Sequence, residues 1–173
     1  MIYRRFLIDT IFILLYYITV CNYVHEGAKT MTIKELFEYW CTFDDDTKNE
    51  LLSITDEKEI EDRFYKELEF GTGGLRGIMG AGPNRMNKYT IAKATKGYAD
   101  YLKSRFDGDI SVAIAYDSRN NSRYFSEVAA GVLSANGIKV YIYDTLMPTP
   151  VLSFTAKHLG CNGGIVLTAS HNP

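Results

Sequence analysis

The residue best placed for chemistry is Ser170, in the closing sequence Thr-Ala-Ser-His-Asn-Pro. The apolar run 164–167 is typical of a buried strand, so the closing sequence forms a loop at a strand end. A loop there presents a serine oxygen outward, where it can carry a transferred group. The same loop holds three more hydrogen-bonding side chains, Thr168, His171 and Asn172. By itself, a serine in such a turn is most often only a turn residue, and Asn-Pro is an ordinary turn signal.

A glycine-rich segment, Gly71–Gly77, indicates anion binding. Its glycines, among them Gly73 and Gly74, let successive backbone N–H groups converge on an anion. Arg76 adds a planar fork of donors that suits phosphate oxygens. The segment is not a Walker A loop, because Gly-Lys-Ser/Thr is missing, and it lacks the G-x-G-x-x-G spacing of a dinucleotide site. The other interpretation is a bare flexible loop.

A third polar segment, Asp117-Ser118-Arg119, follows a short β-rich run over 110–116. Ligands of open α/β sheets bind beyond the carboxyl ends of the strands, so the loop that carries Arg119 is one place to look for a binding site. Considered alone, Asp-Ser-Arg is also typical of a solvated turn.

The elements that position these segments alternate between strand and helix. We expect strands over 110–116, 138–143 and 164–167. Between them, a helix is capped by Ser122 and stopped by Gly137, and another helix covers 151–159. This alternation predicts an α/β fold, with a mainly parallel sheet and helices on both faces. Three loops leave the carboxyl ends of its strands: 117–121, 144–150 and 168–173.

Several helices are expected before this fold. Apolar spacing from Ile33 to Trp40 predicts the first, and the run Asp44–Asp46 starts the second as N-caps rather than as metal ligands. Asp56 and Glu59 have capping-box spacing for a third helix, which we expect to end near residue 70. A longer helix then runs from about residue 91 to the turn at 107–108.

The first thirty residues stand apart from the rest. Phe6–Cys21 is almost wholly apolar, but it is shorter than the ~20 residues of a spanning helix and lacks small residues before a cleavage site. We favour translation from Met31, with a signal anchor as the alternative. The predicted domains are an extension over 1–30, N-terminal helices over 31–70 and an α/β domain over 71–173.

Composition indicates a folded domain in a reducing compartment. The 173 residues are 46% hydrophobic, and 19 Lys and Arg stand against 21 Asp and Glu, with no basic run that would favour nucleic acid. The three cysteines are widely spaced and match no metal or redox motif. We therefore expect a cytoplasmic protein with a small-molecule partner, bound to a membrane only if residues 6–21 are an anchor.

The three segments together carry a resemblance. The closing sequence resembles the active-site signature of the α-D-phosphohexomutase superfamily, the phosphoglucomutases and phosphomannomutases. Gly71–Gly77 resembles the glycine-rich loop of that superfamily, and Ala115–Arg119 resembles its segment after the first long strand. The run from Glu67 to Asn87 is most similar to the phosphoglucomutase-2 and phosphopentomutase branch. The resemblance covers essentially everything from Met31 onward.

The resemblance implies a phosphosugar mutase. Phosphorylated Ser170 would give its phosphoryl group to a hexose or pentose phosphate, pass through a sugar bisphosphate, and regain the other phosphate. His171 would transfer a proton or orient the phosphate, with a structural hydrogen bond as the alternative. The phosphate ligands would be Arg76, Arg119, Gly73, Gly74 and Asn172. Mg²⁺ would be held partly by the phosphate on Ser170.

The sequence stops directly after the serine signature, whereas the superfamily has four domains. The aspartate-rich Mg²⁺ loop, the sugar-recognition loop and the second phosphate loop are absent, so we expect no turnover from these 173 residues alone. One alternative is a noncatalytic, membrane-tethered module that binds phosphosugars. Another is a serine hydrolase, which the missing G-x-S-x-G elbow disfavours.

Overall fold

The computed structural model describes residues 31–169. The predicted extension over 1–30 and the residues Ser170, His171 and Asn172 lie outside the described part. The chain divides into two compact units at Thr90–Ile91, and we call them the helical unit (described from residue 31 to 90) and the sheet unit (91 to 169). Each unit is described by itself.

The helical unit opens with three short helices, α2 (Ile33–Trp40), α3 (Asp45–Leu52) and α4 (Glu57–Phe64). Their buried apolar side chains are Leu36 and Trp40 of α2, Leu51 of α3 and Phe64 of α4. The rings of Trp40, Phe43, Phe64 and Tyr89 form an aromatic cluster. The ring of Trp40 meets that of Phe64 edge-on, with centroids 6.1 Å apart. Because aromatic pairs add to simple burial, this cluster helps to hold α2 and α4 together.

The helix starts are capped by side chains. Asp44 caps α3 and accepts a hydrogen bond from the Thr47 N–H at 2.9 Å, which confirms the predicted N-cap. Asp56 caps α4 by accepting from the Lys58 N–H. The capping-box role expected for Glu59 was wrong, because its carboxylate accepts instead from the Arg63 guanidinium at 2.7 Å.

Helix α4 ends at Phe64, not near residue 70 as expected. Beyond it, Leu68 donates its backbone N–H to Pro83 O at 3.0 Å, so the chain leaves the helix axis to pair with the stretch that follows the glycine-rich segment. Phe70–Gly71 (β1) and Gly74–Leu75 (β2) form a small antiparallel hairpin. The glycine-rich segment Gly71–Gly77, for which a flexible loop was one interpretation, therefore takes part in a short β-hairpin.

The sheet unit holds a three-stranded parallel sheet in the order β4-β3-β5. Its strands are β3 (Ser111–Tyr116), β4 (Lys139–Ile142) and β5 (Gly163–Leu167). β3 is the central strand and its residues 112–116 are buried, so it forms the core of the unit. This arrangement confirms the predicted α/β fold.

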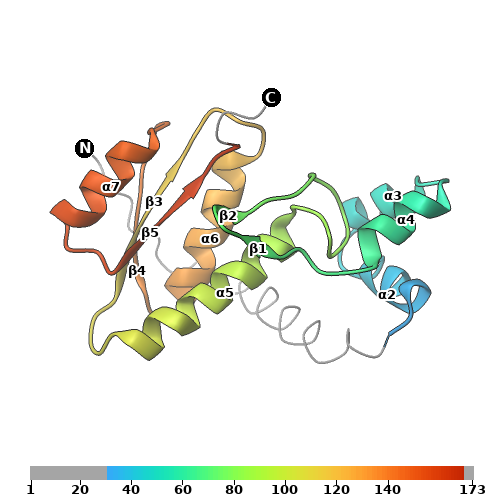
Figure 1. Cartoon of the computed structure of the whole chain (residues 1–173), viewed down its shortest axis with the longest axis horizontal. Helices are drawn as coiled ribbons and strands as arrows, with labels where there is room; N and C mark the ends of the chain where they lie inside the picture. The colour runs from blue at the N-terminus through green and yellow to red at the C-terminus, as the bar shows by residue number, and fades with distance from the viewer. Residues whose placement is uncertain (1–30, 170–173) are drawn as a thin grey trace. The chain divides into compact units, whose positions relative to one another are not determined.

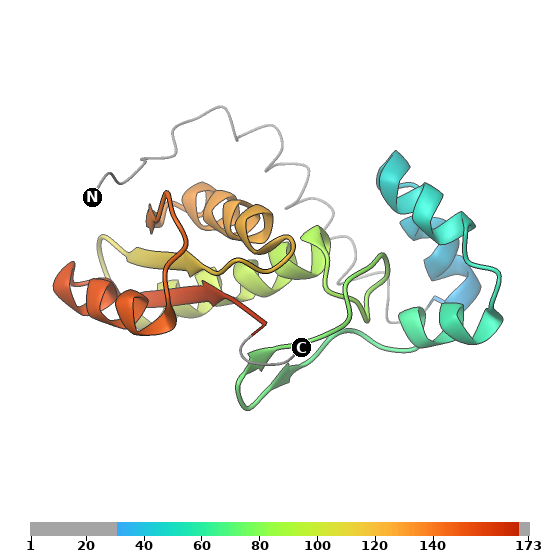
Figure 2. The same cartoon turned by 90° about the horizontal axis from the view of Figure 1, so that it is seen from above.

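Helices cover both faces of the sheet. α6 (Ser122–Ala135) and α7 (Thr149–His158) lie on opposite sides of it (Figure 2), as successive right-handed crossovers require when the strand order reverses. α5 (Lys88–Arg105) begins in the helical unit, and its later turns pack on the sheet (Figure 1). Among residues 31–169, none of the helices combines the length and apolar character needed to cross a bilayer.

Two glycines at the start of β5 allow close packing of the helices. A Cβ at Gly163 would stand 1.9 Å from the Tyr98 hydroxyl of α5, and one at Gly164 would stand 3.5 Å from Leu152 of α7. Neighbouring positions of a strand point to opposite faces, so α5 and α7 approach β5 from opposite sides.

Candidate functional site

Two of the three predicted site segments meet at the carboxyl end of the sheet. The loop after β3 and the residues after β5 lie side by side, because Asp117 N–H donates to Leu167 O at 3.1 Å. The loop after β4 is held to the same edge by a hydrogen bond of 3.1 Å from Met147 N–H to Tyr116 O. The strand ends therefore bring distant loops together, as the parallel topology predicts.

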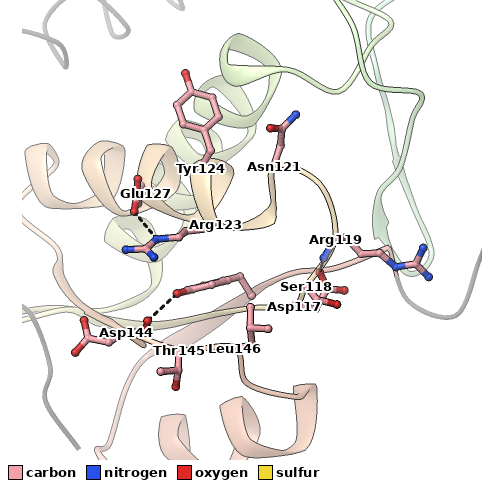
Figure 3. Close-up of a pocket in the computed structure, with 11 residues that line it drawn as sticks. Asp117, Ser118, Arg119, Asn121, Arg123, Tyr124, Glu127, Asp144, Thr145 and Leu146 are labelled. Atoms are coloured by element: carbon pink, nitrogen blue, oxygen red, sulfur yellow. Dashed lines mark hydrogen bonds and ion pairs between the residues drawn. The ribbon is translucent and has the colours of Figure 1, made fainter.

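An open depression of about 680 Å³ lies at this edge (Figure 3). Its walls come from the end of β3, the loop that follows, the first turns of α6 and the loop after β4. The lining residues are Tyr116, Asp117, Ser118, Arg119, Asn121, Arg123, Tyr124, Glu127, Asp144, Thr145 and Leu146. Most of them have polar or charged side chains.

Asp117 connects the loop after β3 to the segment that leads to Ser170. Its Oδ2 accepts from Thr168 Oγ1 at 2.6 Å, across 51 residues of sequence. Its Oδ1 accepts from the Arg119 N–H at 2.9 Å and from Ser122 Oγ at 2.7 Å. Both carboxylate oxygens are therefore used, by donors from three different places in the chain.

These bonds set the charge of Asp117. Partial burial acts to raise the pKa of this carboxyl, but the hydrogen bonds from Thr168, Arg119, Ser122 and the backbone of Ala169 outweigh it. They hold the pKa of Asp117 below its usual range, because donors stabilise the ionised form. Asp117 is thus a carboxylate at neutral pH.

The loop after β3 turns sharply at Asn121, whose backbone is left-handed with φ 63°. Asn121, and not Ser122 as predicted, is the N-cap of α6. Ser122 is instead the first helical residue, and it is buried with its hydroxyl directed at Asp117. An asparagine tolerates this backbone region better than most residues, so the turn sets the entry of α6.

The charged groups around the depression differ in their partners. Arg123 pairs with Glu127 one helical turn later, at 3.1 Å between Nε and Oε1. Arg119 points to the other side of the loop, away from this pair (Figure 3). The Tyr116 hydroxyl donates to Asp144 O at 3.1 Å and so holds the loop after β4.

The glycine-rich segment lies in the helical unit, where its predicted residues occupy the small hairpin. Gly74 has φ 110°, a backbone conformation that favours glycine. A Cβ at Gly73 would stand 3.0 Å from Arg76 Nη2, so the exposed guanidinium folds over this glycine. Gly73, Gly74 and Arg76 are therefore close together in one turn, as a site for an anion requires.

The chain just after the glycine-rich segment is held at Gly80 and Ala81 by a buried arginine that sequence reasoning did not select. Arg63 Nη1 donates to Glu50 Oε1 at 2.6 Å and to Ala81 O at 3.0 Å. Glu50 Oε1 also accepts from Ala81 N–H at 2.9 Å. The pair fixes the backbone of this stretch, and it leaves no space for a side chain at Gly80, where a Cβ would stand 2.9 Å from both charged groups.

Sequence reasoning also missed the role of Asp117. It noted the Asp-Ser-Arg segment for its arginine, whereas the carboxylate is the group that joins two loops. Only the expectation that the two loops share a sheet edge could have indicated this. In residues 31–169, no group of three or more His, Cys, Asp or Glu side chains could hold a metal ion.

Comparison with known proteins identifies relatives of this chain. Residues 67–173 match the family model for the phosphoglucomutase/phosphomannomutase alpha/beta/alpha domain I. A phosphoglucomutase from Staphylococcus haemolyticus is 46% identical over 65% of this chain, which covers 20% of that protein. A human phosphopentomutase is 38% identical over 71% of this chain, which covers 21% of it.

A crystal structure from Thermus thermophilus, described as of phosphomannomutase type, has a TM-score of 0.57 and 34% identity. The match covers 62% of this chain and 24% of the solved one. The chain thus spans about a fifth to a quarter of the length of the relatives it matches.

Proposed function

The chain belongs to the phosphoglucomutase/phosphomannomutase family, and from this premise we propose that it supplies the phosphoryl carrier of a phosphosugar mutase. The carrier is Ser170. The observation that best supports the proposal is the bond from Thr168 to Asp117, because it attaches the serine segment to the loop that bears Arg119. Two of the three family segments, the one leading to Ser170 and the loop after β3, are thus joined at one edge of the sheet.

The reaction is an exchange of phosphoryl groups on one sugar. The bond between phosphorus and the Ser170 oxygen breaks as a sugar hydroxyl attacks; a base takes the proton of that hydroxyl, and the departing serine oxygen takes up a proton in turn. The product is a sugar bisphosphate. The serine oxygen then takes the other phosphoryl group of the bisphosphate and gives a proton to the oxygen that is left. The net result is the positional isomer of the sugar phosphate.

The residues of this chain would divide the work. Arg119 and Arg76 balance the charge on the phosphate oxygens, and the backbone at Gly73 and Gly74 adds N–H donors. Asn172 binds phosphate, and His171 transfers the proton or orients the phosphate. A planar guanidinium contacts two oxygens at once, so we expect each arginine to orient the phosphate as well as neutralise it.

The Mg²⁺ that the family implies is not accounted for by the described residues. Magnesium requires oxygen ligands in octahedral geometry, with carboxylate support. Asp117 is the carboxylate that hydrogen-bonds to the segment leading to Ser170. Both of its oxygens already accept hydrogen bonds from protein donors. Residues 31–169 therefore do not fit a magnesium site, and the steps of the reaction are assigned to groups of the chain itself.

The chain's share of its relatives' length bears on activity. Because it covers 20% to 25% of them, we expect the 173 residues alone to show no turnover. The choice among glucose, mannose and pentose phosphates would be made by contacts beyond the two loops described.

Phosphoserine mapping tests the proposal. The whole product of the native gene is purified, incubated with glucose 1,6-bisphosphate or ribose 1,5-bisphosphate, and analysed by mass spectrometry of its Ser170 peptide. We expect a phosphate on Ser170 that disappears when excess sugar monophosphate is added. A Ser170→Ala variant controls for phosphate at other sites. A Ser170 that stays unmodified with both bisphosphates would contradict the proposed function.

A further inference from the structure

We propose that Asp117 is a positioning residue for Ser170, a role that rests on the proposed function and adds a specific residue to it. Its carboxylate ties Thr168, two residues before the serine, to the loop that carries Arg119. The side chain of Asp117 would therefore fix the positions of both Ser170, which carries the phosphate, and Arg119, which stabilises it.

The first support is that both carboxylate oxygens of Asp117 accept hydrogen bonds. The carboxylate of Asp117 accepts from the hydroxyls of Thr168 and Ser122 and from the backbone N–H of Arg119. A carboxylate accepts from all of them without presenting a hydrogen of its own. The backbone of Asp117 adds a further link, to Leu167 O. The serine segment is thus attached by a side chain and by the main chain at consecutive positions.

The second support is the rigidity of what Asp117 is attached to. Its own strand, β3, is the buried centre of the sheet, and Ser122 anchors the same carboxylate to the start of α6. Thr168, by contrast, is exposed. The hydrogen bond therefore links a buried, rigid strand to an exposed segment. This is the arrangement expected when a rigid element positions a more exposed one.

The third support is chemical. Phosphoryl transfer gains most of its rate from in-line positioning and from charges placed in advance. Asp117 itself is negative and would repel a phosphate, so a direct role in binding is disfavoured. With both oxygens bonded, its charge is directed at protein donors, and it acts through Thr168 and the Arg119 loop.

The test uses the whole gene product and the rate at which phosphorylated Ser170 transfers its group to a sugar phosphate in a single turnover. Thr168→Val keeps the shape of the side chain but removes its hydroxyl, whereas Thr168→Ser keeps the hydroxyl. Asp117→Ala removes the acceptor, and Asp109→Asn makes a similar charge change at the amino end of the same strand, where the side chain is exposed. Urea unfolding of each variant reports stability separately.

We expect Thr168→Val and Asp117→Ala each to slow transfer by about 100-fold, the order reached by small misplacements of reacting groups. The double variant should be no slower than Asp117→Ala alone, because that substitution already removes the bond that Thr168→Val removes. The transfer rate of Thr168→Ser should stay within about threefold of the wild-type rate, and that of Asp109→Asn should equal the wild-type rate. Loss of rate with Thr168→Val at unchanged stability separates positioning from a merely structural role.

Three results would overturn the proposal. Transfer at the wild-type rate in Thr168→Val would remove the positioning role and leave the proposed function standing. Fully additive losses in the double variant would show that the two residues act separately. A wild-type Ser170 that takes no phosphate would end the proposed function, and the positioning role with it. If Asp117→Ala does not fold, the comparison of Thr168→Val with Thr168→Ser still decides, because Thr168 is exposed.

Discussion

Arg63 and Glu50 meet at 2.6 Å and hold the backbone of Ala81 between them, since the arginine donates to its carbonyl and the carboxylate accepts from its N–H. We expect Arg63→Met to lower the free energy of unfolding by about 2–3 kcal/mol, because it leaves the buried carbonyl of Ala81 without its donor and Glu50 without its positive partner. Urea unfolding measures the loss.

Arg123→Met is the matched control for this ion pair. Arg123 also pairs with a glutamate, but its side chain is 68% exposed whereas that of Arg63 is 11% exposed. Exposed pairs contribute little, so we expect a change within about 0.5 kcal/mol. Equal losses in the two variants would contradict the view that burial gives the Arg63 pair its importance.

Acid should destabilise the helical unit through Asp44. Burial acts to raise the pKa of Asp44, but hydrogen bonds from Tyr89, Thr47 and Lys88 hold it well below its usual range. A carboxyl with a depressed folded-state pKa contributes stability above its unfolded pKa of about 3.9, and this is lost as the pH falls further. Asp44→Asn keeps a good N-cap but has no charge to lose.

Unfolding free energies measured between pH 7 and pH 2 test this expectation. The Asp44→Asn variant should be less stable at pH 7 and should lose less stability below about pH 4 than the wild type. Asp45→Asn, an exposed substitution in the same helical turn, should keep the acid slope of the wild type. An unchanged slope in Asp44→Asn would assign the acid sensitivity to other carboxyls.

Gly163→Ala should strain the contact between α5 and β5. Its Cβ would stand 1.9 Å from the Tyr98 hydroxyl, and overpacking of this kind costs about 1–3 kcal/mol. Adding Tyr98→Phe removes the clashing oxygen, so the double variant should regain part of the loss. Thermal unfolding of the two single variants and the double variant measures this. No recovery in the double variant would place the strain elsewhere in the unit.

Replacing either candidate arginine should impair phosphoryl transfer. We expect Arg76→Gln and Arg119→Gln, made in the whole gene product, each to lower kcat/KM about 100-fold, because each removes a charged donor from the phosphate. Lysine at either position should restore only part of the activity, since it lacks the planar fork. Arg105→Gln, at the end of α5 and exposed, is the control and should leave kcat/KM unchanged.

The sheet was predictable from sequence because its strands are short apolar runs. β3 and β5 were placed within one residue of their observed limits, 111–116 and 163–167. The central strand β3 is buried on both faces, and the apolar run that this requires is a local signal that no distant contact has to supply. The parallel topology also predicted that the loops after β3 and β5 would meet at the carboxyl end of the sheet.

The errors arose where a distant contact decided the structure. The third helix was expected to end near residue 70, but the pairing of Leu68 N–H with Pro83 O draws the chain out of the helix. Similarly, Ser122 has the character of an N-cap, yet its hydroxyl serves Asp117 while Asn121 takes the capping position. The bond between Asp117 and Thr168 spans 51 residues, and no local pattern reports it.

That span also has a consequence for biosynthesis. At about 5–20 residues per second, the ribosome adds the 51 residues from Asp117 to Thr168 in roughly 3 to 10 s. Throughout this interval Asp117 has been synthesised but its final partner has not, and β3 lacks the neighbour that β5 will supply. The nascent central strand therefore presents an open edge until its last parallel partner is made, which is a window for chaperone engagement or for pairing with the wrong chain.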